Sequence, residues 1–182
     1  ALYRAGLRAR YPEFQHIHGG LRQGFGGAIR SAWRHLAEHT DATHILHLEA
    51  DFTFNRPAPL TDMAAVLDAN RHLVQMALRR QPWNGHERAA GGIVEMWPSE
   101  YKDCSDLLGR QWLEHELFFT TNPCLYRQSL LDQEWPDGNR SEHAFTRAQL
   151  QADRTARFGY WGARTDPPWV EHIGHTRIGK GY

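Results

Sequence analysis

The sequence lacks an excess of charge of either sign, and it contains no long hydrophobic run. Lysine and arginine together number 21, as do aspartate and glutamate, so the formal net charge is zero. Generic binding to nucleic acid or to anionic membranes needs a broad basic surface, and this charge balance excludes one. The chain has no stretch of about 18 apolar residues, and its mean hydropathy is −0.65, so the sequence predicts no membrane span.

Cysteine is also scarce. The chain has two cysteines, Cys104 and Cys124, which are too few for a secreted disulfide framework and do not have CxxC spacing. We expect two reduced, buried thiols in a reducing compartment. With no recognisable signal peptide in the sequence, this favours a cytoplasmic location.

The remaining composition is that of a globular protein. The chain has 182 residues, of which 41% are hydrophobic and 23% charged, and this length is enough for a single domain with a real core. Twelve histidines and seven tryptophans are many for this length. Both residue types favour polar clefts in which rings stack and imidazoles bind ions or protons.

Hydrophobic spacing predicts an α/β fold. Ile29, Trp33 and Leu36 recur on one face of a helix over residues 28–39, and a second helix begins at Leu60. Short apolar runs at 43–48 and 73–78 are typical of buried strands. Strands that alternate with helices predict a mostly parallel sheet, flanked by helices, formed through crossovers. The other expected elements are a helix at 2–11, a strand at 15–18, a glycine-rich loop at 19–27, a short helix at 101–108, a strand at 117–120, a helix at 142–153 and a strand at 157–160.

The strongest motif is HILHLEADFTF at 44–54, in which an apolar strand leads to Glu49 and Asp51. Ligands of open α/β sheets bind at the carboxyl ends of the strands. Residues two apart on an extended backbone point to the same side, so these two carboxylates can share one divalent cation. Alternatively, the two acids could simply solvate a loop.

With its glycine-rich upstream segment, this motif resembles the family 2-like glycosyltransferases of the GT-A fold. In that family a central strand ends in an Asp-x-Asp motif, which holds a divalent metal and the donor diphosphate. GGLRQGFGGAIRSAWRHL at 19–36 is similar to the family's segment against the nucleotide, with Arg22 and Gly24 at donor-binding positions. The sequence departs from the family's pattern at Glu49, where Asp is usual, and at Arg22, where Asn is frequent.

The resemblance implies a GT-A-like, Rossmann-type domain over residues 1–182. Residues 1–80 would form the donor and metal half, and residues 81–182 an irregular acceptor half with a C-terminal tail. The family's first strands have no counterpart here, so we expect the domain to be truncated at its N-terminus. The implied partners are a nucleotide-sugar donor and an acceptor hydroxyl, and the implied cofactor is Mn²⁺ or Mg²⁺.

The resemblance also assigns a general base. NRSEHAFTRAQL at 139–150 places Glu142 at the start of an expected helix, where the helix dipole favours a carboxylate in any case. In the family, an acid in this region deprotonates the acceptor hydroxyl, and Glu142 is similar to that residue. Glu134 and Asp137 are the nearby alternatives.

The C-terminal stretch WVEHIGHTRIGKGY at 169–182 is similar to the tail with which relatives complete the metal shell and cover the diphosphate. The resemblance makes His172 the candidate metal ligand beside Asp51 and Glu49, with His175 second. Arg177 and Lys180 would neutralise phosphate, or they could lie in a solvated tail.

Two other classes of function remain open. Pairs of histidines, such as His44 with His47, are compatible with a zinc hydrolase, although none has a third ligand at a recognised spacing. The aromatic loops are compatible with a non-catalytic domain that binds a nucleotide sugar, a glycan or a protein.

Overall fold

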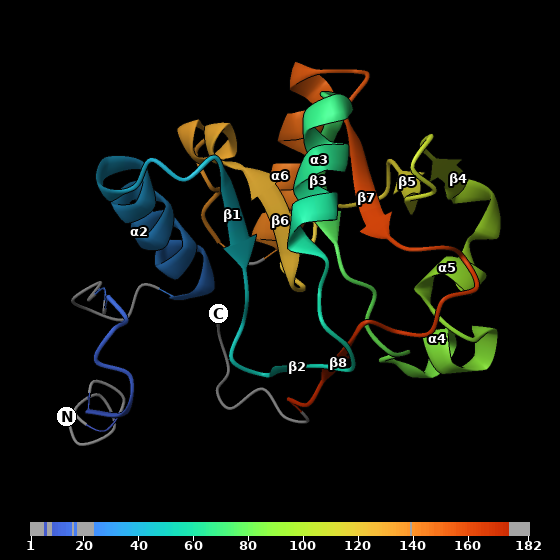
Figure 1. The fold of residues 1–182 in the computed structure, drawn as a ribbon, viewed down its shortest axis with the longest axis horizontal. Helices are drawn as coiled ribbons and strands as arrows, with labels where there is room; N and C mark the ends of the chain where they lie inside the picture. The colour runs from blue at the N-terminus through green and yellow to red at the C-terminus, as the bar shows by residue number, and fades with distance from the viewer. Residues whose placement is uncertain (1–5, 7–8, 16, 18–23, 139, 175–182) are drawn as a thin grey trace.

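The computed structural model describes residues 6, 9–15, 17, 24–138 and 140–174. Within these residues the chain forms a six-stranded sheet, a two-stranded sheet and flanking helices (Figure 1). The helices are α2 (Gly24–His39), α3 (Leu60–Ala69), α4 (Gly85–Ala90), α5 (Ile93–Met96) and α6 (Ser141–Ala152), with the 3₁₀ turns η1 (Pro98–Glu100) and η2 (Gln128–Asp132). The strands are β1 (His44–His47), β2 (Phe52–Phe54), β3 (Leu73–Ala77), β4 (Lys102–Ser105), β5 (Gln111–His115), β6 (Cys124–Arg127), β7 (Arg157–Trp161) and β8 (Val170–His172).

The main sheet is mixed, so the prediction of a mostly parallel sheet is wrong. Its strand order is β1-β6-β3-β7-β5-β4, and only β3 and β7 pair in parallel. Strand β6 comes from later in the chain and lies between β1 and β3, antiparallel to both. Therefore β1 and β3 run in the same direction, as strands joined by a helical crossover do, but they do not pair directly. The broader prediction of an α/β fold with helices flanking a sheet is confirmed.

The strongly periodic elements lie where the sequence predicts them. The helix predicted from the spacing of Ile29 and Trp33 corresponds to α2, in which both residues are buried. The predicted helix at 142–153 corresponds to α6. The expected strands at 43–48, 73–78 and 157–160 correspond to β1, β3 and β7. The expected elements at 2–11 and 15–18 lie largely outside the described residues.

Three local predictions are wrong. Residues 102–105 form β4 instead of a helix, because they pair with β5 in a hairpin whose turn is held by Asp106. Residues 117–120 form no strand, and the strand begins later, at Cys124. Helix α2 begins at Gly24, inside the predicted loop. Gly26 lies so close to the chain at Trp135 that a Cβ there would be 3.1 Å from the Pro136 carbonyl oxygen, which explains a glycine inside the helix.

Helices cover both faces of the main sheet (Figure 1). One face packs against α2 and α6 through an aromatic cluster, in which Trp33, Phe119, Trp135 and Phe145 make edge and stacked ring contacts at 4.8–5.7 Å. The other face packs against α3 through a second buried cluster. Burial on both faces fixes the sheet as the rigid base from which the loops at its ends project.

A buried hydroxyl ties helix α6 to the chain between β5 and β6. Thr146 Oγ1 accepts a hydrogen bond from the Phe119 amide at 2.8 Å and donates one to the Glu142 carbonyl oxygen at 2.7 Å. Both Thr146 and Phe119 are buried. A Thr146→Val variant leaves the Phe119 amide without its acceptor, so we expect the free energy of unfolding to fall by about 1–3 kcal/mol in urea titrations. Thr146→Ser keeps the hydroxyl and is the control. An equal loss in both variants would contradict the role of the hydrogen bond.

His115 lies in the aromatic core and makes folding sensitive to pH. Its ring is 2% exposed and packs against Tyr101, Phe118 and Tyr160, with centroids 4.9–5.3 Å apart. Burial lowers the pKa of His115 from 6.5 to about 3. The unfolded chain therefore binds this proton more readily. The stabilising contribution is complete above pH 6.5 and is lost as the pH falls toward 3.

We expect His115 to account for about 2 kcal/mol of the stability lost between pH 8 and pH 5, since each pKa unit corresponds to about 1.4 kcal/mol. Urea unfolding of the wild type and of His115→Phe at both pH values measures this contribution. The variant should lose less stability on acidification, whatever its stability at pH 8. If His115→Phe loses as much stability as the wild type between pH 8 and pH 5, a group other than His115 causes the acid sensitivity.

Candidate functional site

The candidate site lies at the end of the sheet where β1 finishes. His47, the last residue of β1, pairs with Cys124, the first residue of β6, and α6 begins close to the same end. Burial, followed by the charges of Glu142 and Glu49, raises the pKa of the Cys124 thiol well above its ordinary value. Both carboxylates are therefore near enough to affect the pKa of the same buried thiol at this edge, although they come from distant parts of the sequence.

Asp51 and His172 are brought together by the two-stranded sheet. Strands β2 and β8 pair with Phe52 opposite His172, and the Ile173 amide donates to the Asp51 carbonyl oxygen at 2.8 Å. This register places His172 Nε2 3.0 Å from Asp51 Oδ2. In Figure 1 the small sheet lies beside the loop that leaves β1, at the lower edge of the molecule.

The chain after β3 fixes the position of His172. The Gln81 side chain donates from Nε2 to the His172 carbonyl oxygen and accepts from the His172 amide, both at 2.9 Å. Trp83 lies edge-on to the imidazole at 4.2 Å, and Phe52 contacts it at 4.7 Å. No motif in the sequence points to Gln81 or Trp83. Their place just after a predicted strand is the signal that could have indicated them.

Gly174 allows the chain to pass close to Asp51. A Cβ at this position would lie 2.5 Å from Asp51 Oδ2, which is closer than any real Cβ contact. The residue after Ile173 must therefore be small if Asp51 is to keep its place.

Asp51 and His172 have the donor atoms that a divalent cation requires. Asp51 Oδ1 and His172 Nδ1 are buried and have no hydrogen-bond partner among the described residues. The facing atoms, Oδ2 and Nε2, are 3.0 Å apart, which is about the separation of two neighbouring ligands that each lie about 2.1 Å from one octahedral ion. The same distance fits an ion pair when His172 is protonated. The distance therefore suits either two ligands of one metal ion or a direct ion pair.

The third expected ligand, Glu49, is not assembled with this pair. Its Oε1 lies 4.0 Å from His47 Nε2. Within the described ranges, no group of three His, Cys, Asp or Glu side chains is arranged to hold a metal ion. Of the three predicted ligands, Asp51 and His172 are thus in contact with each other, and Glu49 is not grouped with this pair.

Glu142 occupies the first turn of α6 and is partly buried. Its Oε1 accepts hydrogen bonds from the amide and the hydroxyl of Thr121, at 2.7 and 2.8 Å. No hydrogen bond from another described residue reaches Oε2. One oxygen therefore holds the carboxylate in place while the other is available to a ligand. Of the two alternatives, Asp137 pairs with Arg30, and Glu134 is exposed.

The other predicted donor-binding residues are only partly covered by the structure. Gly24 is the first residue of α2 and has a φ of 66°, a conformation that glycine adopts readily. Arg22, His175, Arg177 and Lys180 lie outside the described residues. Cys104 and Cys124 are free thiols, of which Cys124 is buried and Cys104 half-buried.

Comparison of the chain with protein-family models, with curated proteins and with solved structures finds no match. In the part of the chain that the structure describes, none of the helices is both long and apolar enough to cross a membrane.

Proposed function

We propose that this protein is a metal-dependent glycosyltransferase of GT-A type, which moves a sugar from a nucleotide-sugar donor to an acceptor hydroxyl with inversion. The observation that carries the proposal is the meeting of Asp51 with His172, from opposite halves of the chain, where β1 ends. Glu142 lies at the same edge of the sheet. This combination is what the resemblance to family 2-like glycosyltransferases implies.

In this proposal Asp51 and His172 hold Mn²⁺ or Mg²⁺, with Glu49 assisting. A bound divalent cation would neutralise the charge that develops on the leaving nucleoside diphosphate. Asp51 Oδ1 is buried and has no partner among the described residues, which is costly unless a ligand satisfies it. Trp83 packs against the His172 ring, and Gln81 fixes the backbone of His172, so that the ring is supported from behind as metal ligands are in other proteins.

Glu142 serves as the general base. The two Thr121 hydrogen bonds fix Oε1, so that Oε2 can accept the proton of the acceptor hydroxyl. The acceptor oxygen then bonds to the anomeric carbon while the bond from that carbon to the diphosphate oxygen breaks. Attack opposite the leaving group inverts the configuration, and the proton stays on Glu142. Arg22, Gly24 and Arg177 complete the donor site in this proposal.

The test is release of nucleoside diphosphate from UDP-, GDP- and dTDP-sugars, measured with Mn²⁺ and with EDTA. We expect release from one donor class, dependent on Mn²⁺ and stopped by EDTA. If no donor is turned over and the protein binds one of them, it is a binding domain. If no donor is turned over and the purified protein contains zinc, the hydrolase alternative gains support. Either result overturns the proposal.

A further inference from the structure

A cavity lies at the opposite end of α6 from Glu142. It has a volume of about 240 Å³, which about eight molecules of liquid water would fill. Its wall comes from the last turn of α6, the start of β3, the end of β6 and the turn η2. Neither the Asp51–His172 pair nor Glu142 lines it, so it is separate from the candidate site.

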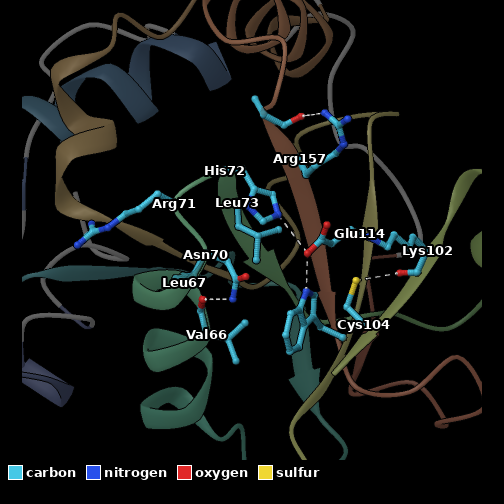
Figure 2. Close-up of polar contacts among 12 residues, drawn as sticks. Val66, Leu67, Asn70, Arg71, His72, Leu73, Lys102, Cys104, Glu114 and Arg157 are labelled. Carbon is cyan, nitrogen blue, oxygen red and sulfur yellow. Dashed lines mark hydrogen bonds and ion pairs between the residues drawn. The ribbon is translucent and has the colours of Figure 1, made fainter. Parts of the chain in front are cut away.

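The polar wall of this cavity has donors that lack acceptors. Gln149 is 93% buried, and its Nε2 has no hydrogen-bond partner among the described residues. Arg71 is exposed, and no ion pair with another described residue engages its guanidinium group. Figure 2 shows Arg71 pointing away from Glu114, whereas its neighbour His72 points toward Glu114. A buried amide without a partner destabilises the folded protein, and a hydrogen bond to a ligand oxygen would remove that cost.

The side chains that line the cavity carry more positive than negative charge. Arg127 also lines it, and this guanidinium is anchored by carbonyl oxygens that include Leu67 and Leu73. Among the described residues of the wall, Asp153 is the one carboxylate, and its Oδ1 already accepts hydrogen bonds from the Thr155 amide and hydroxyl. The described wall therefore has two guanidinium groups and one carboxylate, and one oxygen of that carboxylate is already engaged.

The rest of the wall is apolar, with Val74, Leu130 and Ala156 among its residues. A bare inorganic anion would leave this surface in contact with water. An organic acid would cover it with carbon while its carboxylate meets the donors. From these observations we infer that the cavity beneath the C-terminal end of α6 binds a small organic carboxylate, with Arg71 and Gln149 holding the carboxylate group.

Benzoate is a suitable probe, because its nine non-hydrogen atoms match the cavity and benzamide is its neutral counterpart of the same shape. At a benzoate concentration a hundred times its Kd, thermal unfolding of the wild-type protein should shift upward by about 5–10 °C. Benzamide and inorganic phosphate should give much smaller shifts. The side-chain amide resonance of Gln149 should move on titration with benzoate.

Arg71→Gln and Gln149→Leu should each weaken benzoate binding at least tenfold. Arg147→Gln is the matched control, since Arg147 is exposed on the same helix and does not line the cavity. The inference is overturned if benzoate gives no shift at millimolar concentrations. It is also overturned if benzamide or phosphate shifts the unfolding temperature as much, or if Arg71→Gln and Gln149→Leu bind benzoate as tightly as the control does.

Discussion

Replacing Asp51 by asparagine is expected to lower the rate of nucleoside diphosphate release about a thousandfold. Asparagine keeps the size of the side chain and can still contact His172, so the fold should persist, but it removes the negative charge that attracts a cation. Stabilisation of developing charge by a metal ion is worth several kcal/mol, and each 1.4 kcal/mol changes a rate tenfold. Initial rates with Mn²⁺, together with the Mn²⁺ concentration at half-maximal rate, measure the effect.

Glu171→Gln is the matched control for Asp51→Asn. Glu171 precedes His172 on β8, is exposed, and pairs across to Thr53 through its backbone. Its substitution removes one carboxylate from the same small sheet and should leave the rate within about twofold of the wild type, because an exposed charge contributes little. If Asp51→Asn keeps wild-type turnover and metal dependence, Asp51 is not a metal ligand.

Replacing Glu142 by glutamine is expected to lower kcat by about 10²–10⁴, the usual contribution of a general base. The substitution is conservative, because a glutamine oxygen can still accept both hydrogen bonds from Thr121. Glutamine cannot take the proton of the acceptor hydroxyl. The affinity for the donor should change little, so the loss should appear in kcat and not in the KM for the nucleotide sugar.

The control for this variant is Glu134→Gln, which removes an alternative base. Glu134 is exposed, and its loss should leave kcat unchanged. Thermal unfolding of both variants checks that neither loses stability. A large drop in kcat for Glu134→Gln with little change for Glu142→Gln would move the base to Glu134.

The elements that the sequence predicted correctly are those with a strong local signal. In α2, Ile29 and Trp33 repeat at the helical period and are buried in the structure. The apolar run of β1 ends before the acids Glu49 and Asp51, as expected. The hairpin of β4 and β5 was missed because KDCS is polar and has neither a helical nor an alternating period. It is a strand only because β5 offers it backbone partners.

The strand order that makes the sheet mixed could not be predicted from local patterns. Alternation of strands and helices predicts that β1 and β3 run in the same direction, and they do. Nothing in the residues near either strand shows that β6 inserts between them and makes the sheet mixed. Local patterns also do not indicate Gln81, because a single glutamine after a strand is common. Its role is visible only in the structure, where its side chain bonds the backbone of His172.

The sequence by itself determined that this is an α/β chain with a balanced charge and acids at the end of its first described strand. Through its resemblance to a family, it also indicated which carboxylates and histidines are candidates for the site. Only the tertiary structure decided that Asp51 meets His172 and that Glu142 is held by Thr121. The reason is physical. Propensity and periodicity act over a few neighbouring residues, whereas these contacts depend on strand pairing and burial, in which residues from both halves of the chain take part together.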